Sequence, residues 1–78
     1  MNRKVYEEWL KINVEIHNKL EDLKKLDYEK IMLIKEAEEK GFNEEIKEKM
    51  DESVKKYNYL LEEIKLLNLK AYELKNKV

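Results

Sequence analysis

The side chains that could do chemistry are few in this chain, and their spacing does not suit any common site. His17 is the only histidine and cysteine is absent, so a zinc site with four protein ligands lacks nitrogen and sulfur donors. A di-iron site in a helical bundle needs Glu-x-x-His pairs, but the residue three positions before His17 is Val14. Ser53, the only serine, has no histidine within reach in the helical fold inferred below. We therefore expect no catalytic residue, no cofactor and no metal site.

Carboxylates are numerous, but nearly all fall on the polar faces of the predicted helices. Asp27 is the one acid that we place on an apolar face, near Tyr57 of the other helix. A hydrogen bond from the phenol to the carboxylate would satisfy both groups there. We interpret this pair as structural and His17 as solvated. With no glycine-rich phosphate loop and no nucleophile elbow in the sequence, we expect a protein that is not an enzyme.

Two long helices must position these residues, and the second helix has the clearer pattern. Its apolar residues follow strict 4,3 spacing, which predicts a heptad seam with one polar member. The seam comprises Ile46, Met50, Ser53, Tyr57, Leu60, Ile64, Leu67, Ala71, Leu74 and Val78. Val54 and Leu61 follow it at heptad position e and widen the apolar stripe.

The apolar face of the first half is less regular. It comprises Val5, Trp9, Ile12, Ile16, Leu20, Leu23, Ile31 and Ile34, with Asp27 in its middle. The repeat is nearer to about 3.67 than to 3.5 residues, which predicts little supercoiling. The segment 24–28 contains no Gly, Pro or Asn, so we expect one helix to continue through Asp27. A break there, giving three helices, is the alternative.

The segment Lys40-Gly41-Phe42-Asn43 predicts a tight turn. Gly41 suits the left-handed conformation that ends a helix, and an apolar residue such as Phe42 can then fold back on the last turn. Asn43 is a good N-cap. The predicted fold is therefore all-α: one domain, residues 1–78, forming an antiparallel two-helix hairpin with helices at about 3–40 and 44–77. Folding at Phe42 places residue i near residue 84−i.

Composition limits the partners and the compartment. Charged residues make up 45% of the 78 residues, but the net charge is only −1, so no broad field attracts nucleic acid or an anionic membrane. No segment approaches the about 18 apolar residues of a membrane span. The N-terminal residues lack the apolar core of a signal peptide. We expect a cytoplasmic protein that binds no membrane.

Several apolar residues lie outside the predicted seam, near the end of the hairpin away from the turn. Contiguous exposed apolar surface usually marks an interface. The predicted partner-binding residues are Tyr6, Leu10, Tyr59, Leu66, Leu69 and Tyr72. A second hairpin would bury them in a homodimeric four-helix bundle, and a different protein presenting a helix is the alternative.

Two short patterns resemble known helical-hairpin families. The segment 39–46, Glu-Lys-Gly-Phe-Asn-Glu-Glu-Ile, resembles the turn of the small helical-hairpin aspartyl-phosphate phosphatases of the sporulation phosphorelay. Members carry a Ser-x-x-Leu-Asp-like signature on the second helix, where this chain has Met50-Asp51-Glu52-Ser53-Val54. The signature serine, leucine and aspartate are replaced, so the resemblance implies a hairpin and a phosphorelay role without a residue to perform it. In pattern alone the chain also resembles flagellar export chaperones, which hold a client in an apolar groove.

A row of lysines gives the third hypothesis. Lys49, Lys56, Lys70 and Lys77 share heptad position g, interrupted by Glu63, and in outline this resembles the dimeric helical hairpins of plasmid copy-control RNA-binding proteins. Lysines beside a seam normally pair with acids of the neighbouring helix. Our leading hypothesis is therefore a non-enzymatic protein–protein interaction module, an adaptor, regulator or chaperone; the alternatives are a phosphorelay regulator and an RNA-binding protein.

Overall fold

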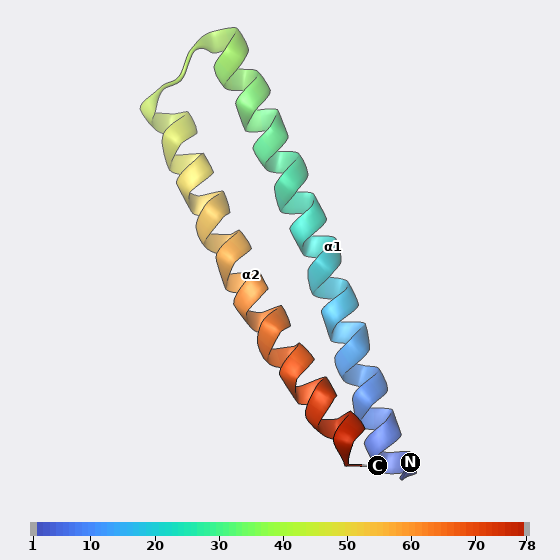
Figure 1. Cartoon of the computed structure of the whole chain (residues 1–78). Coiled ribbons are helices and arrows are strands. Elements are labelled where there is room, and N and C mark those ends of the chain that lie inside the picture. The colour runs from blue at the N-terminus through green and yellow to red at the C-terminus, as the bar shows by residue number, and fades with distance from the viewer. Residues whose placement is uncertain (1, 78) are drawn as a thin grey trace.

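The structure is a computed structural model that describes residues 2–77, and it consists of two helices packed side by side (Figure 1). Helix α1 spans Arg3–Lys40 and α2 spans Glu44–Asn76. They run antiparallel, so both ends of the chain lie at the end opposite the turn, and the molecule is a rod of 57 × 14 × 12 Å. The predicted all-α hairpin is confirmed, and α1 continues through Asp27 without a break.

Side-chain caps determine where the helices begin. The Asn2 side chain accepts a hydrogen bond from the Lys4 backbone N–H at 2.9 Å. The Asn43 side chain does the same for Ile46, also at 2.9 Å. Each cap satisfies one of the N–H groups that a helix leaves without a partner at its start. Asn43 is therefore the N-cap that the sequence predicts.

Gly41 ends α1, although not in the expected conformation. Its N–H donates to the carbonyl of Ala37 at 2.9 Å, and its φ of 83° and ψ of 155° are open essentially only to glycine. This ψ is far from that of the left-handed helical cap, so the chain leaves α1 extended. Phe42 is consequently 65% exposed, and the prediction that it folds back on α1 is wrong.

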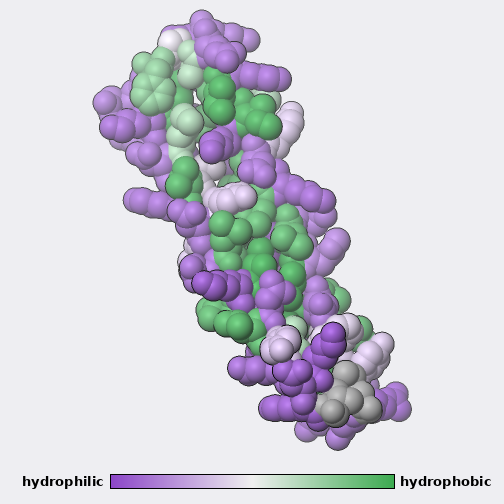
Figure 2. All heavy atoms as spheres, in the orientation of Figure 1, coloured by the Kyte–Doolittle hydropathy of each residue, from purple (hydrophilic) through white to green (hydrophobic). Residues whose placement is uncertain are grey.

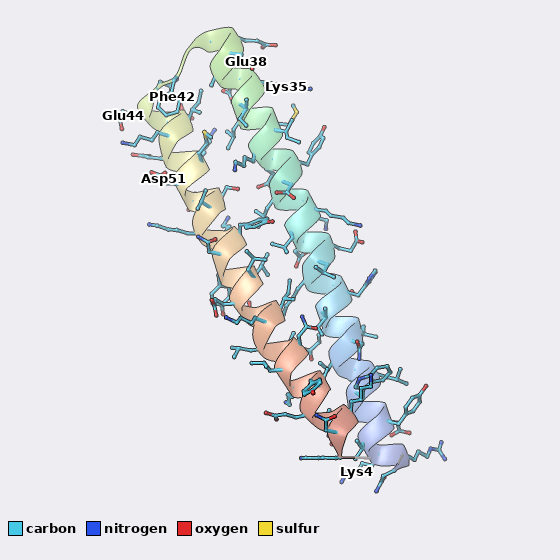
Figure 3. All side chains as sticks on the ribbon, viewed as in Figure 1. Lys4, Lys35, Glu38, Phe42, Glu44 and Asp51 are labelled. Atoms are coloured by element: carbon cyan, nitrogen blue, oxygen red, sulfur yellow. The ribbon has the colours of Figure 1, made fainter. Side chains whose placement is uncertain are left out.

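The seam of α2 is as predicted within the described residues. Ile46, Ile64, Ala71 and Leu74 are buried, while Met50, Ser53, Tyr57, Leu60 and Leu67 are half-buried. Val78, the last predicted member, lies outside the described residues. The labelled side chains of Lys35 in α1 and Asp51 in α2 project outward on opposite sides of the hairpin (Figure 3).

The seam of α1 departs from the predicted one beyond Ile16. Lys19, Leu23, Leu26, Leu33 and Ala37 are covered, whereas Leu20, Ile31 and Ile34 are exposed, and so is Asp27. From Val5 onward the covered residues follow strict 4,3 spacing, with the exposed Lys30 at one of the positions: Val5, Trp9, Ile12, Ile16, Lys19, Leu23, Leu26, Lys30, Leu33 and Ala37. The apparent drift arose because apolar neighbours stand next to the two lysines of the seam. The repeat is therefore that of a heptad, and the inference of a 3.67-residue repeat is wrong.

The two seams meet in successive layers along the rod. Ile12 forms a core cluster with Ala71 and Leu74, against which Val5, Trp9, Ile16 and Leu67 pack. Ala71 is one residue away from Tyr72, which the predicted register placed opposite Ile12. The layers thus pair residue i with about 83−i, since the turn is centred between Gly41 and Phe42 rather than on Phe42.

Candidate interaction surface

The hairpin has two long sides, which the heptad register defines. In an antiparallel pair, the e positions of both helices lie on one side of the seam and the g positions on the other. Grooves between the helices agree with this. One is lined by residues including Asp27, Val54 and Asn58. Another, on the opposite side, is lined by residues including Glu29 and Lys49.

We call the g side the charged flank because every one of its positions is ionisable. In α1 it consists of Glu8, Glu15, Asp22, Glu29 and Glu36, and in α2 of Lys49, Lys56, Glu63, Lys70 and Lys77. An acidic row therefore runs along a mainly basic row of the same chain. Glu29, Glu36, Lys49 and Lys56 all border a single groove. The lysine row that suggested RNA binding thus faces carboxylates of its own hairpin, which lowers its positive potential.

Among residues 2–77 one ion pair joins the two helices, and it explains the lysine at a seam position. Lys19 Nζ lies 3.0 Å from Glu63 Oε2. The two side chains are only 23% and 32% exposed. The Glu63 carboxylate, through this hydrogen bond and its charge, raises the pKa of Lys19 above its ordinary value. The butyl stem of Lys19 fills the seam while its ammonium reaches the charged flank. Glu63 therefore interrupts the lysine row at the level where α1 supplies a cation.

We call the e side the apolar flank. In α1 it consists of Tyr6, Asn13, Leu20, Asp27 and Ile34, and in α2 of Lys47, Val54, Leu61, Asn68 and Lys75. Leu20 and Leu61 are each 43% exposed, because one side of each chain already rests on the seam. Apolar side chains extend across both helices in the middle of the face drawn in Figure 2. This flank carries half-covered apolar groups with few charges among them.

The six predicted contact residues are all exposed, but the register divides them. Tyr6, Leu10 and Tyr72 occupy e or b positions, on or next to the apolar flank. Tyr6 also stacks on Trp9 with ring centroids 6.1 Å apart. Helix geometry therefore gathers these residues on one side of the rod.

The other three contact residues lie elsewhere on the surface. Tyr59 and Leu66 occupy c positions, and Tyr59 lines a groove of the charged flank together with Asp22 and Glu29. Leu69 occupies an f position and points away from α1. The six residues thus do not form one continuous patch.

Sequence reasoning missed the apolar flank because it counted Leu20 and Ile34 in the seam. It likewise treated Val54 and Leu61 as a widening of the α2 stripe. When the 4,3 spacing of α1 is continued through Lys19 and Lys30 it places all four on the flank, but nothing in the sequence marks these two lysines as seam residues.

The residues considered for chemistry are not assembled into a site. His17 is exposed, and Ser53 is half-buried between the helices. Asp27 and Tyr57 border the same groove, but no hydrogen bond joins them among the described residues. Asp27 is at an e position, outside the seam, so its predicted pairing with Tyr57 is wrong. Within residues 2–77 no cluster of His, Cys, Asp or Glu is arranged to hold a metal ion.

Comparisons of the chain with protein-family models, with curated proteins and with solved structures find no match. Neither α1 nor α2, as described, contains an apolar stretch long enough to cross a membrane.

Proposed function

We propose that this chain is a non-enzymatic interaction module, an adaptor, regulator or chaperone that acts in the cytoplasm through helix-to-helix contact. The observation that carries the proposal is an imbalance between surface and core. Among the described residues, seven apolar side chains are buried while fifteen large ones are exposed. A two-helix rod has no third element to cover them, and apolar surface of this extent usually meets a partner.

The contact residues of this proposal are the exposed apolar side chains of both long sides. Tyr6, Leu10 and Tyr72 would serve one partner surface, and Tyr59 and Leu66 another, with Leu69 beside them on the outward face of α2. Burial of such side chains contributes about 25 cal/mol per Å² of apolar area removed from water. A homodimeric four-helix bundle and a helix of another protein are the two modes of burial.

Site-specific photocrosslinking in the native host tests the proposal. A photoreactive phenylalanine analogue would replace Leu61, Leu66 or Leu69 in turn, with Glu62 as the matched control at an exposed polar position. We expect adducts from at least one leucine position and none from the control. Adducts of twice the mass of the chain mean a second copy, and other masses mean a different protein. A chain that yields no adduct from any leucine position is not an interaction module.

The two alternatives have less support. RNA binding predicts an affinity that falls steeply with salt, but the acidic row of α1 faces the lysine row of α2 across the charged flank. A phosphorelay regulator would need a carboxylate or amide that reaches a partner's phosphoaspartate, and Ser53 is half-buried at the corresponding segment. Salt titration of RNA binding and the hydrolysis rate of a phosphoaspartyl response regulator would test them separately.

A further inference from the structure

The two flanks of the hairpin differ in the charge and the polarity of their side chains. On the charged flank, the acidic row of α1 runs along the mainly basic row of α2 within one chain, so charges of opposite sign lie near each other there without a partner. On the apolar flank, leucine, isoleucine, valine and tyrosine side chains are half-covered by the seam and open to water on the other side. The apolar side chains that border the seam are therefore concentrated on the apolar flank.

We propose that the apolar flank is the contact surface for a second copy of this chain, which docks face to face and leaves both charged flanks in water. This inference deepens the proposed function and rests on it. It assigns the contact to one side of the rod and names the occupant. It also removes Tyr59, Leu66 and Leu69 from the interface between copies.

The area of the flank matches what a stable dimer needs. A face of 57 by 14 Å covers about 800 Å², so complete face-to-face contact of two copies would cover about 1,600 Å² in all, the usual size of a specific interface. A single partner helix would cover only about half of the two-helix face. A second hairpin of the same length covers all of it.

The charges favour the same occupant. The ten e positions carry one acid, Asp27, and two lysines, Lys47 and Lys75, and the lysines lie towards the two ends of the rod. The central layer, Leu20 and Leu61, is uncharged. Asn13 and Asn68 lie one heptad away towards the chain ends, and Asp27 and Val54 lie one heptad away towards the turn. The partner must then present an uncharged apolar centre, and an identical flank does so.

The positions of Leu20 and Leu61 are compatible with a two-fold symmetric dimer. Leu20 and Leu61 lie near the midpoints of α1 and α2, so a two-fold axis through the centre of the flank brings both leucines of each copy into one central layer. This holds whether the two turns are at the same end or at opposite ends of the dimer. The result is a four-helix bundle with isologous contacts.

Sedimentation velocity with two matched double variants tests the proposal. Leu20→Glu with Leu61→Glu changes the centre of the apolar flank, and Leu66→Glu with Leu69→Glu changes two leucines that are more exposed and lie off it. We expect the wild type and the Leu66/Leu69 variant to sediment at twice 9.6 kDa. We expect the Leu20/Leu61 variant to sediment at 9.6 kDa with its helical circular dichroism retained.

A second measurement avoids the case in which the charged variant unfolds. Since the chain has no cysteine, a single Leu20→Cys or Leu69→Cys change provides one thiol per copy for a short bis-maleimide cross-linker. Covalent dimers are expected from Leu20→Cys and not from Leu69→Cys.

The outcomes separate this inference from the proposed function. A dimer that only the Leu66/Leu69 variant disrupts, or that cross-links only at Leu69→Cys, overturns the assignment to the apolar flank but leaves an interaction module. A wild type that stays at 9.6 kDa overturns the second copy as occupant, while photo-adducts of other masses at Leu61 would still support the proposed function.

Discussion

Replacing Gly41 by alanine should destabilise the hairpin through backbone strain alone. An added Cβ at Gly41 meets nothing within 4 Å, so there is no clash to confuse the result. With φ at 83° and ψ at 155°, a non-glycine residue costs about 1–3 kcal/mol. Alanine also restricts the unfolded chain, which returns about 0.4–1 kcal/mol. The net loss of unfolding free energy should lie between about 0 and 2.6 kcal/mol, with about 1.3 kcal/mol as the central value.

The assay is urea unfolding followed by far-ultraviolet circular dichroism, repeated at several protein concentrations to separate folding from association. Gly41→Asn is the informative control. Asparagine tolerates the left-handed helical region, in which ψ is about 47°, but not the extended region that Gly41 occupies. Asparagine should therefore cost about as much as alanine. An alanine variant more stable than the wild type, or rescue by asparagine alone, would refute this account of the turn.

Three further changes test the caps, the seam and the ion pair. Asn43→Ala removes the side-chain acceptor at the start of α2 and should cost about 1 kcal/mol, with faster amide exchange in its first turn; unchanged exchange would contradict the cap. Leu26→Ala in the seam should cost at least about 2 kcal/mol, whereas exposed Val14→Ala should change stability by less than about 0.5 kcal/mol, both measured by urea unfolding. The raised pKa of Lys19 means that its pair with Glu63 stabilises the fold below pH 10.5 and that this contribution is lost as the pH rises through the folded pKa. Lys19→Gln should therefore lose less stability than the wild type between neutral pH and pH 11, and parallel curves would show that the pair contributes nothing.

The resemblance to the helical-hairpin phosphatases lies in the turn segment and does not extend to the signature residues of that family. The phosphatase-like segment forms the turn of the hairpin here. Gly41 ends α1 and Asn43 caps α2, and these two roles are needed in any short connection between helices. The segment that would carry the phosphatase signature includes Ser53, which is half-buried between the helices. The turn is therefore evidence of local structure and carries no evidence of activity.

The sequence alone determined the elements, because helix formation is local. A single glycine, no proline, an asparagine cap and unbroken helical periodicity are enough to predict α1 and α2 to within a residue or two of their observed bounds. The seam of α2 was equally readable, since nine apolar residues and one serine keep 4,3 spacing.

Only the tertiary structure decided which residues of α1 meet α2 and which form the flanks. When an apolar residue stands next to a lysine, the sequence pattern favours placing the apolar residue in the seam, as it did for Leu20 beside Lys19. In the folded hairpin the position of a side chain is decided by the opposite helix, and Glu63 lets Lys19 occupy the seam by offering its ammonium a partner at 3.0 Å. That contact joins residues 44 positions apart, so no local pattern could reveal it. With Lys19 in the seam, Leu20 lies on the apolar flank, at the centre of the proposed interface.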